Sequence, residues 1–323
     1  MKALVTGGTG FIGRALCAEL LRRGWTVDCL ARKPERLPTG AVFTSGDVAE
    51  PSSLASATGP YDAVFHLAGL ITFDRARLPD LMRVNAGGTE NVLAALPRWG
   101  KPRFVLVSSA ITCGISDSPL VMRNEKSAPD GADCNPYMQS KLLAEQAALA
   151  AAARGTDALI VNPTTVYGPG DYTLNSGSLI KTILKAPVVP AGSGGCNVAD
   201  VEDVVCGIAA AYEKGRAGSR YILGGYNMIF TELYRKVTAA AGARTIVVPL
   251  PRFLRLPAAL AAGFAEKTGL GGRFITSQIV NDLFKYKYYS TALADAELDL
   301  PPRRPFEDTL RRALEFYRRE GLL

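Results

Sequence analysis

A tyrosine and a lysine stand four positions apart in Tyr137-Met138-Gln139-Ser140-Lys141, at the start of a predicted helix. One helical turn places both side chains on the same face, about 6 Å apart along the axis. A lysine there lowers the pKa of the phenol from about 10 toward the working pH, which suits general acid–base catalysis. Ser109 follows a predicted strand upstream and supplies a hydroxyl that can polarise a carbonyl. The three residue types predict proton transfer at a carbonyl oxygen.

A glycine-rich segment near the N-terminus predicts the partner for that chemistry. Gly7, Gly10 and Gly13 are spaced G-x-x-G-x-x-G between an apolar strand (Ala3–Val5) and a helical pattern that runs from Ile12 to Arg23. Such glycines allow a tight turn, close approach of the backbone to a pyrophosphate, and close packing of helix on strand. The positive end of the helix then faces the pyrophosphate. The loop therefore predicts dinucleotide binding.

The end of the second predicted strand, Val27–Leu30, indicates which dinucleotide is bound. A carboxylate at this point would hold the ribose 2′-hydroxyl of NAD(H). The residues that follow are Ala31, Arg32 and Lys33, so two cations stand where a 2′-phosphate would lie. Because a guanidinium suits phosphate, we favour NADP(H) and keep NAD(H) as the alternative.

Further along the chain, two strand ends are expected to contact the same cofactor. Asp47, after the third strand, is placed to accept a hydrogen bond from the adenine amino group. The segment Leu67-Ala68-Gly69 ends the fourth strand and is expected to pass beneath the cofactor.

The elements that position these residues alternate between strand and helix. Further strands are predicted at Val27–Leu30, Val42–Thr44, Ala63–Leu67, Arg103–Ser108 and Ala158–Val161, with helices at Leu81–Leu96 and Lys141–Ala153. Strands separated by helices form a parallel sheet covered on both faces. We therefore predict an α/β protein with a doubly wound parallel-sheet Rossmann fold.

After Asn162-Pro163 the pattern loosens, with many Gly and Pro residues and shorter helices. We predict that residues 1–168 form the NADP-binding Rossmann domain and that 196–230 return to it. Residues 169–195 and 231–323 are expected to form a smaller, mostly helical substrate-binding portion.

Composition limits the remaining function classes. The chain has 323 residues, 48% of them hydrophobic, and a formal net charge of +7. The C-terminal arginines alternate with carboxylates on a predicted helix, so we interpret them as a solvated face with i,i+4 pairs and expect no nucleic-acid partner. The six cysteines include no C-x-x-C pair, and His66 is the only histidine. We therefore expect reduced thiols, a cytoplasmic protein, a structural His66 and no metal site.

The most apolar segment of the second half is Leu256–Ala265, only ten residues long. It is too short to span a bilayer, and no signal peptide is visible. We expect a buried or substrate-lining helix there, with a peripheral membrane contact or a lipid substrate as the alternatives.

Several segments together resemble the extended short-chain dehydrogenase/reductase family over most of the chain. They are Thr6–Gly13, Val84–Leu93, Val107–Ala110, Pro136–Lys141, Asn162–Gly170 and Asn197–Val204. The resemblance implies that Tyr137 exchanges a proton with the substrate oxygen, Ser109 hydrogen-bonds that oxygen, and Lys141 also holds the nicotinamide ribose. It implies that Asn85 supports a proton-relay water. The cofactor contacts expected on this basis are Gly7, Thr9, Gly10, Phe11, Ile12, Gly13, Arg32, Lys33, Asp47, Val48, Leu67, Ala68, Gly69, Asn85, Tyr137, Lys141, Pro163, Thr164, Thr165 and Val166.

The chain departs from the family pattern at three positions. Cys113 stands where an aromatic residue is usual, Asp200 where a histidine is frequent, and Asn162 where an arginine commonly precedes the proline. These departures concern the substrate pocket rather than hydride transfer.

Three functions follow from these observations. The first is an NADP(H)-dependent oxidoreductase that acts on the ketone or secondary alcohol of an apolar sterol-, flavonoid- or lipid-like molecule, in the dihydroflavonol reductase and 3β-hydroxysteroid dehydrogenase branch. The second is a nucleotide-sugar epimerase or dehydratase with tightly bound NAD, which would need a diphosphate-binding arginine such as Arg216, Arg273 or Arg311. The third, a non-enzymatic dinucleotide sensor, has no need of Ser109, Tyr137 and Lys141. We favour the first and expect a homodimer formed by the helices at Leu81–Leu96 and Lys141–Ala153.

Overall fold

A seven-stranded sheet organises the larger part of the protein. The computed structural model describes residues 1–130, 134–268 and 277–323. The strand order is β10-β6-β5-β4-β1-β2-β3, and every neighbouring pair is parallel. The strands are β1 (Lys2–Thr6), β2 (Thr26–Ala31), β3 (Val42–Ser45), β4 (Ala63–His66), β5 (Arg103–Val107), β6 (Ala158–Pro163) and β10 (Arg220–Leu223). The order reverses between β1 and β4, which confirms the doubly wound Rossmann fold.

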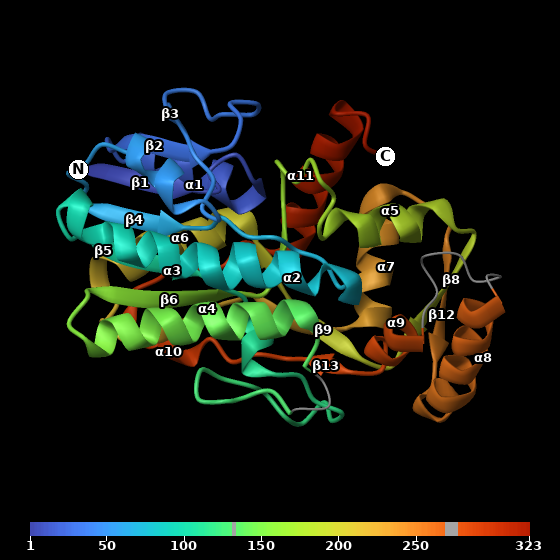
Figure 1. Cartoon of the computed structure of the whole chain (residues 1–323). Helices are drawn as coiled ribbons and strands as arrows, with labels where there is room; N and C mark the ends of the chain where they lie inside the picture. The colour runs from blue at the N-terminus through green and yellow to red at the C-terminus, as the bar shows by residue number, and fades with distance from the viewer. Residues whose placement is uncertain (131–133, 269–276) are drawn as a thin grey trace.

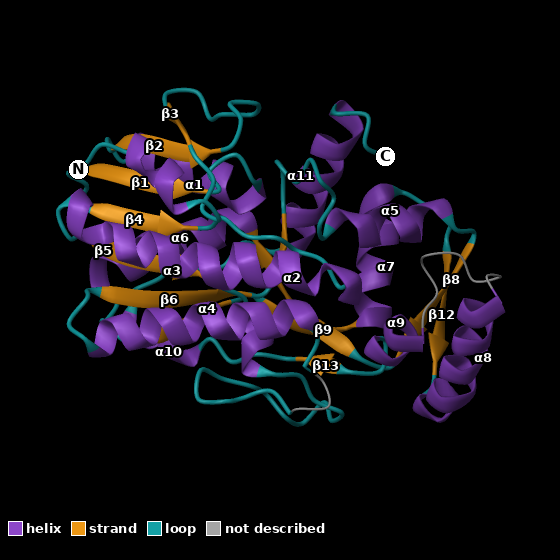
Figure 2. Cartoon of the chain, in the orientation of Figure 1, coloured by secondary structure: helices purple, strands orange, loops and turns teal. Residues whose placement is uncertain are grey.

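Helices cover both faces of this sheet (Figures 1 and 2). Alternate residues of β1 show how the layers are built: Ala3 and Val5 pack in one core, and Leu4 packs in another. The first core includes buried residues of α1 (Phe11–Arg22) and α6 (Val201–Lys214). The second includes buried residues of α3 (Gly88–Ala95) and α4 (Pro136–Ala153). The central strands are mostly apolar because both of their faces are buried.

The two helices that carry functional residues differ in detail from the sequence expectation. Helix α4 begins at Pro136, five residues before the predicted start, because Asn135 caps it by accepting a hydrogen bond from the Met138 amide at 2.8 Å. The predicted helix Leu81–Leu96 begins at the last residue of α2 (Leu78–Leu81) and includes α3, but a π-helical turn at Met82–Gly87 separates the two helices. Such turns are frequent at functional sites.

The smaller part contains short sheets as well as helices. Strand β9 (Gly195–Asp200) pairs with β7 (Thr165–Tyr167), β11 (Tyr226–Ile229) and β13 (Tyr286–Lys287), while β8 (Val188–Gly192) pairs with β12 (Ile246–Leu250). The helices are α5 (Gly177–Lys185), α7 (Phe230–Ala241), α8 (Arg255–Thr268), α9 (Ser277–Asp282), α10 (Ala292–Glu297) and α11 (Phe306–Arg319). A third core joins α5, α7 and α11 to these strands. Within 196–230, α6 and β10 return to the large sheet, whereas β9 and β11 belong to the small one.

Helix α8 corrects one expectation. The apolar segment Leu256–Ala265 is expected to be buried or to line the substrate site. Leu256, Leu260 and Phe264 are exposed, so the expected burial is wrong, while the substrate-lining role stays a prediction. Only Ala262 is buried among the described side chains of this helix. No helix in the described ranges is long and apolar enough to cross a membrane.

Candidate active site

The glycine loop between β1 and α1 is shaped by close backbone contacts. Gly7 has a φ of +72°, and the Gly10 amide donates to its carbonyl at 3.0 Å. A Cβ on Gly7 would lie 2.6 Å from the Ala68 nitrogen, and one on Gly13 would lie 2.2 Å from the Gly7 oxygen. Because no side chain fits at either position, the loop leaves its backbone open at the N-terminus of α1. This cradle fits the pyrophosphate of a dinucleotide.

The ends of the parallel strands bring the expected catalytic residues to the same edge of the sheet. Ser109 follows β5 and caps the short turn Ala110–Cys113. The Tyr137 ring is buried in the first turn of α4, and Ser109 is its side-chain hydrogen-bond partner. Lys141, one turn later, donates from Nζ to the Val107 carbonyl at 3.0 Å. The structure thus brings together the three residues that were chosen from their types and spacing.

The pKa of Tyr137 differs from the expectation. Burial is the largest cause, and together with the opposing hydrogen bond from Ser109 and the negative charge of Glu145 it raises the pKa to about 12. The expectation that Lys141 pulls the pKa of this phenol below 10 is therefore wrong for this structure, because desolvation of the phenolate dominates. At neutral pH the phenol is protonated, which is the state required of a proton donor.

Lys141 titrates much closer to neutrality than an exposed lysine. Burial lowers its pKa to about 8, and the negative charge of Glu145 opposes that shift. If Lys141 acts in its charged form, as expected from the sequence, kcat/KM should fall above about pH 8, by up to about tenfold per pH unit, as the lysine loses its charge. Rates measured between pH 6 and 10 test this, and a profile that stays flat to pH 10 would contradict it.

The titration of Lys141 does not by itself destabilise the fold over the same pH range. Between pH 8 and the ordinary lysine pKa of 10.5, the unfolded chain holds the Lys141 proton more strongly than the folded chain does. Deprotonation of Lys141 therefore increases the stability of the fold over this range. Circular dichroism at each pH provides the control.

Asn85 lies in the π-helical turn and fastens the loop that follows β4. Its Oδ1 accepts from the Leu70 amide at 2.7 Å, and its Nδ2 donates to the Leu70 carbonyl at 3.0 Å and to Ser140 Oγ at 2.8 Å. Both amide hydrogens are thus used within the protein. The side chain of Asn85 thus holds this loop in place, and its support of a relay water stays a prediction.

The other expected cofactor contacts surround the glycine loop and the Lys141 amine. The Ala68 amide donates to Thr6 Oγ1 at 3.2 Å, so the segment after β4 lies beside the end of β1. A Cβ on Gly69 would lie 3.5 Å from Lys141 Nζ. The segment Pro163–Val166 connects β6 with β7, where Thr164 Oγ1 donates to Asn197 Oδ1 at 2.8 Å. Thr9, Phe11 and Ile12 are partly exposed at the start of α1.

The residues expected to select the cofactor lie at the ends of β2 and β3. Arg32 and Lys33 follow β2, both are exposed, and neither makes an ion pair with any residue of the described ranges. Asp47 follows β3 and its Oδ1 accepts from the Ala49 amide at 2.9 Å. Val48 is buried against Gly88 of α3. The two cations are therefore free to meet a phosphate.

A buried polar network behind Ser109 was missed in the sequence. Glu145 Oε1 accepts from Asn162 Nδ2 at 2.6 Å and from Thr112 Oγ1 at 2.8 Å. Arg220 reaches the same carboxylate at 3.4 Å and donates to the Cys113 sulfur at 2.8 Å. Glu145 stands at i+8 from Tyr137 and i+4 from Lys141, so its position on the same helix face could be predicted from the sequence. Its hydrogen-bond and ion-pair partners come from other elements, so those contacts could not be predicted.

This network also accounts for two of the three departures from the family pattern. An arginine is usual at position 162, but here Asn162 occupies it and Arg220 on the neighbouring strand β10 supplies the guanidinium. Cys113 accepts a hydrogen bond from that guanidinium instead of presenting an aromatic ring. Arg220 of β10 thus supplies the positive charge opposite the Glu145 carboxylate.

His66 is a buried structural residue at the end of β4. Its Nδ1 lies 2.7 Å from Thr6 Oγ1 and its Nε2 lies 3.1 Å from Thr89 Oγ1. Burial, followed by the charge of Lys141, lowers its pKa to about 3. His66 is therefore neutral at physiological pH and links β1 to α3.

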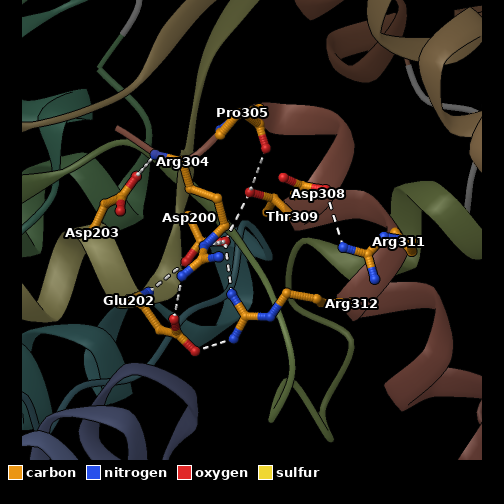
Figure 3. Close-up of polar contacts among 9 residues, drawn as sticks. All are labelled: Asp200, Glu202, Asp203, Arg304, Pro305, Asp308, Thr309, Arg311 and Arg312. Atoms are coloured by element: carbon orange, nitrogen blue, oxygen red, sulfur yellow. Dashed lines mark hydrogen bonds and ion pairs between the residues drawn. The ribbon is translucent and has the colours of Figure 1, made fainter. Parts of the chain in front are cut away.

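The third departure, Asp200, joins the C-terminal segment to the start of α6 (Figure 3). Asp200 is buried, accepts from Thr309 Oγ1 at 2.8 Å, and pairs with Arg304 at 3.5 Å and Arg312 at 3.6 Å. Both arginines also bind Glu202. The interpretation of the C-terminal arginines as a solvated face is thus wrong for this pair, although Arg311 makes the expected i,i+4 pair with Glu315 at 3.6 Å.

The arginines considered for a diphosphate are poorly placed in the described structure. Arg216 precedes β10 and therefore lies at the opposite edge of the sheet from Ser109, where it pairs with Glu297. Arg311 pairs with Asp308 at 3.0 Å on the surface of α11. Arg273 lies outside the described residues.

Comparison with known proteins agrees with this geometry. The model of the NAD dependent epimerase/dehydratase family matches residues 3–224. A putative dihydroflavonol 4-reductase of Synechocystis sp. is 29% identical over 98% of this chain and 94% of its own length. The 3 beta-hydroxysteroid dehydrogenase/Delta 5→4-isomerase of Mycobacterium tuberculosis is 29% identical over 98% of this chain and 90% of its own.

A solved structure supports the fold over the whole chain. The dTDP-glucose 4,6-dehydratase DesIV of Streptomyces venezuelae matches with a TM-score of 0.79, over 100% of this chain and 98% of that one, at 24% identity. These findings confirm the resemblance drawn from the motifs. The chain belongs to the NAD-dependent epimerase/dehydratase family and is an NAD(P)-dependent oxidoreductase of the extended short-chain dehydrogenase/reductase type.

Proposed function

We propose that this protein transfers a hydride between NADP(H) and the ketone or secondary alcohol carbon of an apolar small molecule, such as a sterol, flavonoid or lipid-like compound. The observation that carries the proposal is the apolar surface beside Tyr137. The Phe73 ring meets the Tyr137 ring edge-on at 5.9 Å between centroids. Phe73 is 59% exposed and its neighbour Ile71 is 52% exposed. An apolar substrate bound at the phenol would cover both side chains and remove them from water.

Two further observations support an apolar substrate over a nucleotide sugar. Arg216 and Arg311, considered for a diphosphate, are paired with carboxylates. The relatives that match nearly the whole chain include proteins named for flavonoid and steroid substrates. A nucleotide-sugar dehydratase shares the fold, which by itself does not specify a substrate.

Each residue of the site then has its own role in the reaction. The nicotinamide ring, when bound, supplies or accepts the hydride. In reduction, Tyr137 donates its phenolic proton to the substrate oxygen, and the Ser109 hydroxyl hydrogen-bonds the same oxygen. Lys141, while protonated, stabilises the phenolate that remains and hydrogen-bonds the nicotinamide ribose. Asn85 keeps the loop after β4 in place beside the Lys141 amine.

A substrate screen tests this function directly. Bulky apolar ketones and nucleotide sugars are incubated separately with the protein and NADPH, and NADPH oxidation is measured. Turnover of at least one apolar ketone, with none of the sugars altered, is expected. Conversion of a UDP- or dTDP-sugar without net oxidation of the cofactor, detected by chromatography of the products, would instead establish an epimerase or dehydratase.

Cofactor preference is expected to depend on Arg32. The wild-type protein should bind NADPH more tightly than NADH, because the guanidinium makes a charge-assisted hydrogen bond to the 2′-phosphate. Arg32→Glu should erase or reverse the preference, since the carboxylate repels that phosphate and accepts from the 2′-hydroxyl of NADH. Fluorescence titration with both dinucleotides measures the ratio. Equal affinities of the wild type for the two cofactors would count against the proposal.

We also propose that the protein is a homodimer that pairs through α3 and α4. Leu143 on α4 is exposed although it is apolar. Analytical ultracentrifugation should show a dimer that Leu143→Glu weakens.

A further inference from the structure

Strands β8 and β12 and helix α8 lie on the small part of the molecule, at the end away from β1 to β3 (Figure 1). These elements and the short turn Arg252–Leu254 before α8 carry large apolar side chains that are exposed. We call this set the lobe surface: Val188, Ile246, Val248, Phe253, Leu256 and Leu260. Ile246 pairs with Val188 in the two-stranded sheet, and Leu256 and Leu260 stand one turn apart on α8.

These side chains are unusually exposed for their type. The exposed fraction is 79% for Phe253, 75% for Leu260, 73% for Leu256 and 62% for Ile246. In soluble proteins, large apolar side chains gathered in this way mark a surface that meets another phase or molecule. Neither the hydride transfer nor the dinucleotide site uses any of them.

The charged residues of the segment that carries most of the lobe surface are all basic. Between Gly242 and Ala265 the chain has three arginines, Arg244, Arg252 and Arg255, and no aspartate or glutamate. One carboxylate from elsewhere, Asp117, lies nearby and is shared among Arg255 at 2.6 Å, Lys285 at 2.8 Å and Arg252 at 4.0 Å. Arg244 is exposed. The positive charge is therefore in excess and complements a negatively charged partner.

We propose that the lobe surface docks on an anionic lipid bilayer. Exposed leucine and phenylalanine side chains enter the interface, and the arginines beside them meet the lipid phosphates, as in interfacial amphipathic helices. The partner would be the bilayer surface rather than its interior, since the apolar stretch of α8 is short. This inference stands on the lobe surface alone and does not depend on the proposed function.

Vesicle co-sedimentation tests the proposal without any substrate. The protein should bind vesicles of phosphatidylcholine with about one-third phosphatidylglycerol far more tightly than vesicles of pure phosphatidylcholine. The triple variant Phe253→Ser/Leu256→Ser/Leu260→Ser should bind the anionic vesicles at least about tenfold more weakly. Arg244→Glu/Arg252→Glu should also lose at least about tenfold, because each basic residue near such a surface contributes roughly a fivefold factor.

A matched pair provides the control. Arg98→Glu/Arg154→Glu makes the same change in net charge at two exposed arginines of the nucleotide-binding part, and it should leave vesicle binding within about twofold of the wild type. All substitutions are at exposed positions, so urea unfolding midpoints should stay unchanged.

Three results would overturn the proposal. The first is no binding of the wild type to anionic vesicles. The second is an equal loss in the control pair, which would show a general charge effect. The third is a wild-type oligomer that dissociates in the triple serine variant, because the lobe surface would then be covered by a second copy of the chain.

Discussion

Tyr137→Phe should lower turnover by about 10²- to 10⁴-fold, the range expected when a positioned proton donor is removed. The substitution deletes one hydroxyl and keeps the ring that packs edge-on against Phe73. Because it removes a single hydroxyl and leaves the glycine loop and Lys141 unchanged, NADPH affinity should stay within about twofold. Steady-state rates and a fluorescence titration of NADPH measure the two effects separately.

A second tyrosine offers a control for this experiment. Tyr212→Phe makes the same chemical change on α6, where the hydroxyl contacts only the Met1 sulfur, at 4.0 Å, among described residues. It should leave turnover unchanged. If Tyr137→Phe kept more than about a tenth of wild-type activity, another group would have to protonate the substrate and the assigned role of Tyr137 would be wrong.

Gly13→Ala should damage the cofactor site and the fold together. The added Cβ would lie 2.2 Å from the Gly7 oxygen and 2.8 Å from the Gly8 Cα, and both are backbone atoms that can move only if the loop moves. Overpacking of this kind costs about 1–3 kcal/mol. The urea unfolding midpoint should fall accordingly, and dinucleotide affinity should fall about tenfold or more, because the loop cradle no longer has its shape.

Gly87→Ala is the matched substitution on a nearby helix. A Cβ there meets its nearest atom at 3.7 Å, an ordinary contact, so binding should be unaffected and stability should be equal or slightly higher. Unchanged NADPH affinity in Gly13→Ala would mean that the dinucleotide does not depend on the shape of this loop.

Much of the fold could be predicted because its signals are local. Six of the seven strands of the large sheet are predicted from short apolar segments, and the glycine spacing follows directly from the turn between β1 and α1. Strand β10 (Arg220–Leu223) is not among the predicted strands. The boundaries were less certain, since caps decide them: the Asn135 cap places the start of α4 before Tyr137. The π-helical turn around Asn85 has no pattern of its own, because it inserts one residue into an otherwise ordinary helical sequence.

The three proposed catalytic residues could likewise be predicted from their spacing in the sequence. Tyr137 and Lys141 are one turn apart on a single helix, and Ser109 follows a strand that must end at the same edge of a parallel sheet. The pKa values of these side chains could not be predicted from the sequence. The pKa of Tyr137 depends on burial, and burial depends on everything packed around the ring.

The sequence by itself determined the features that depend on neighbouring residues. These are the glycine loop, the Tyr137–Lys141 pair one helical turn apart, and the cations that follow β2. Tertiary structure decided which distant residues meet. Arg220 reaches Glu145 from a neighbouring strand, and Arg304 and Arg312 reach Asp200 from about a hundred residues away. Contacts along one helix follow from a fixed geometry of 3.6 residues per turn. A contact between distant segments follows only from the path of the whole chain, which the packing of the buried cores sets together.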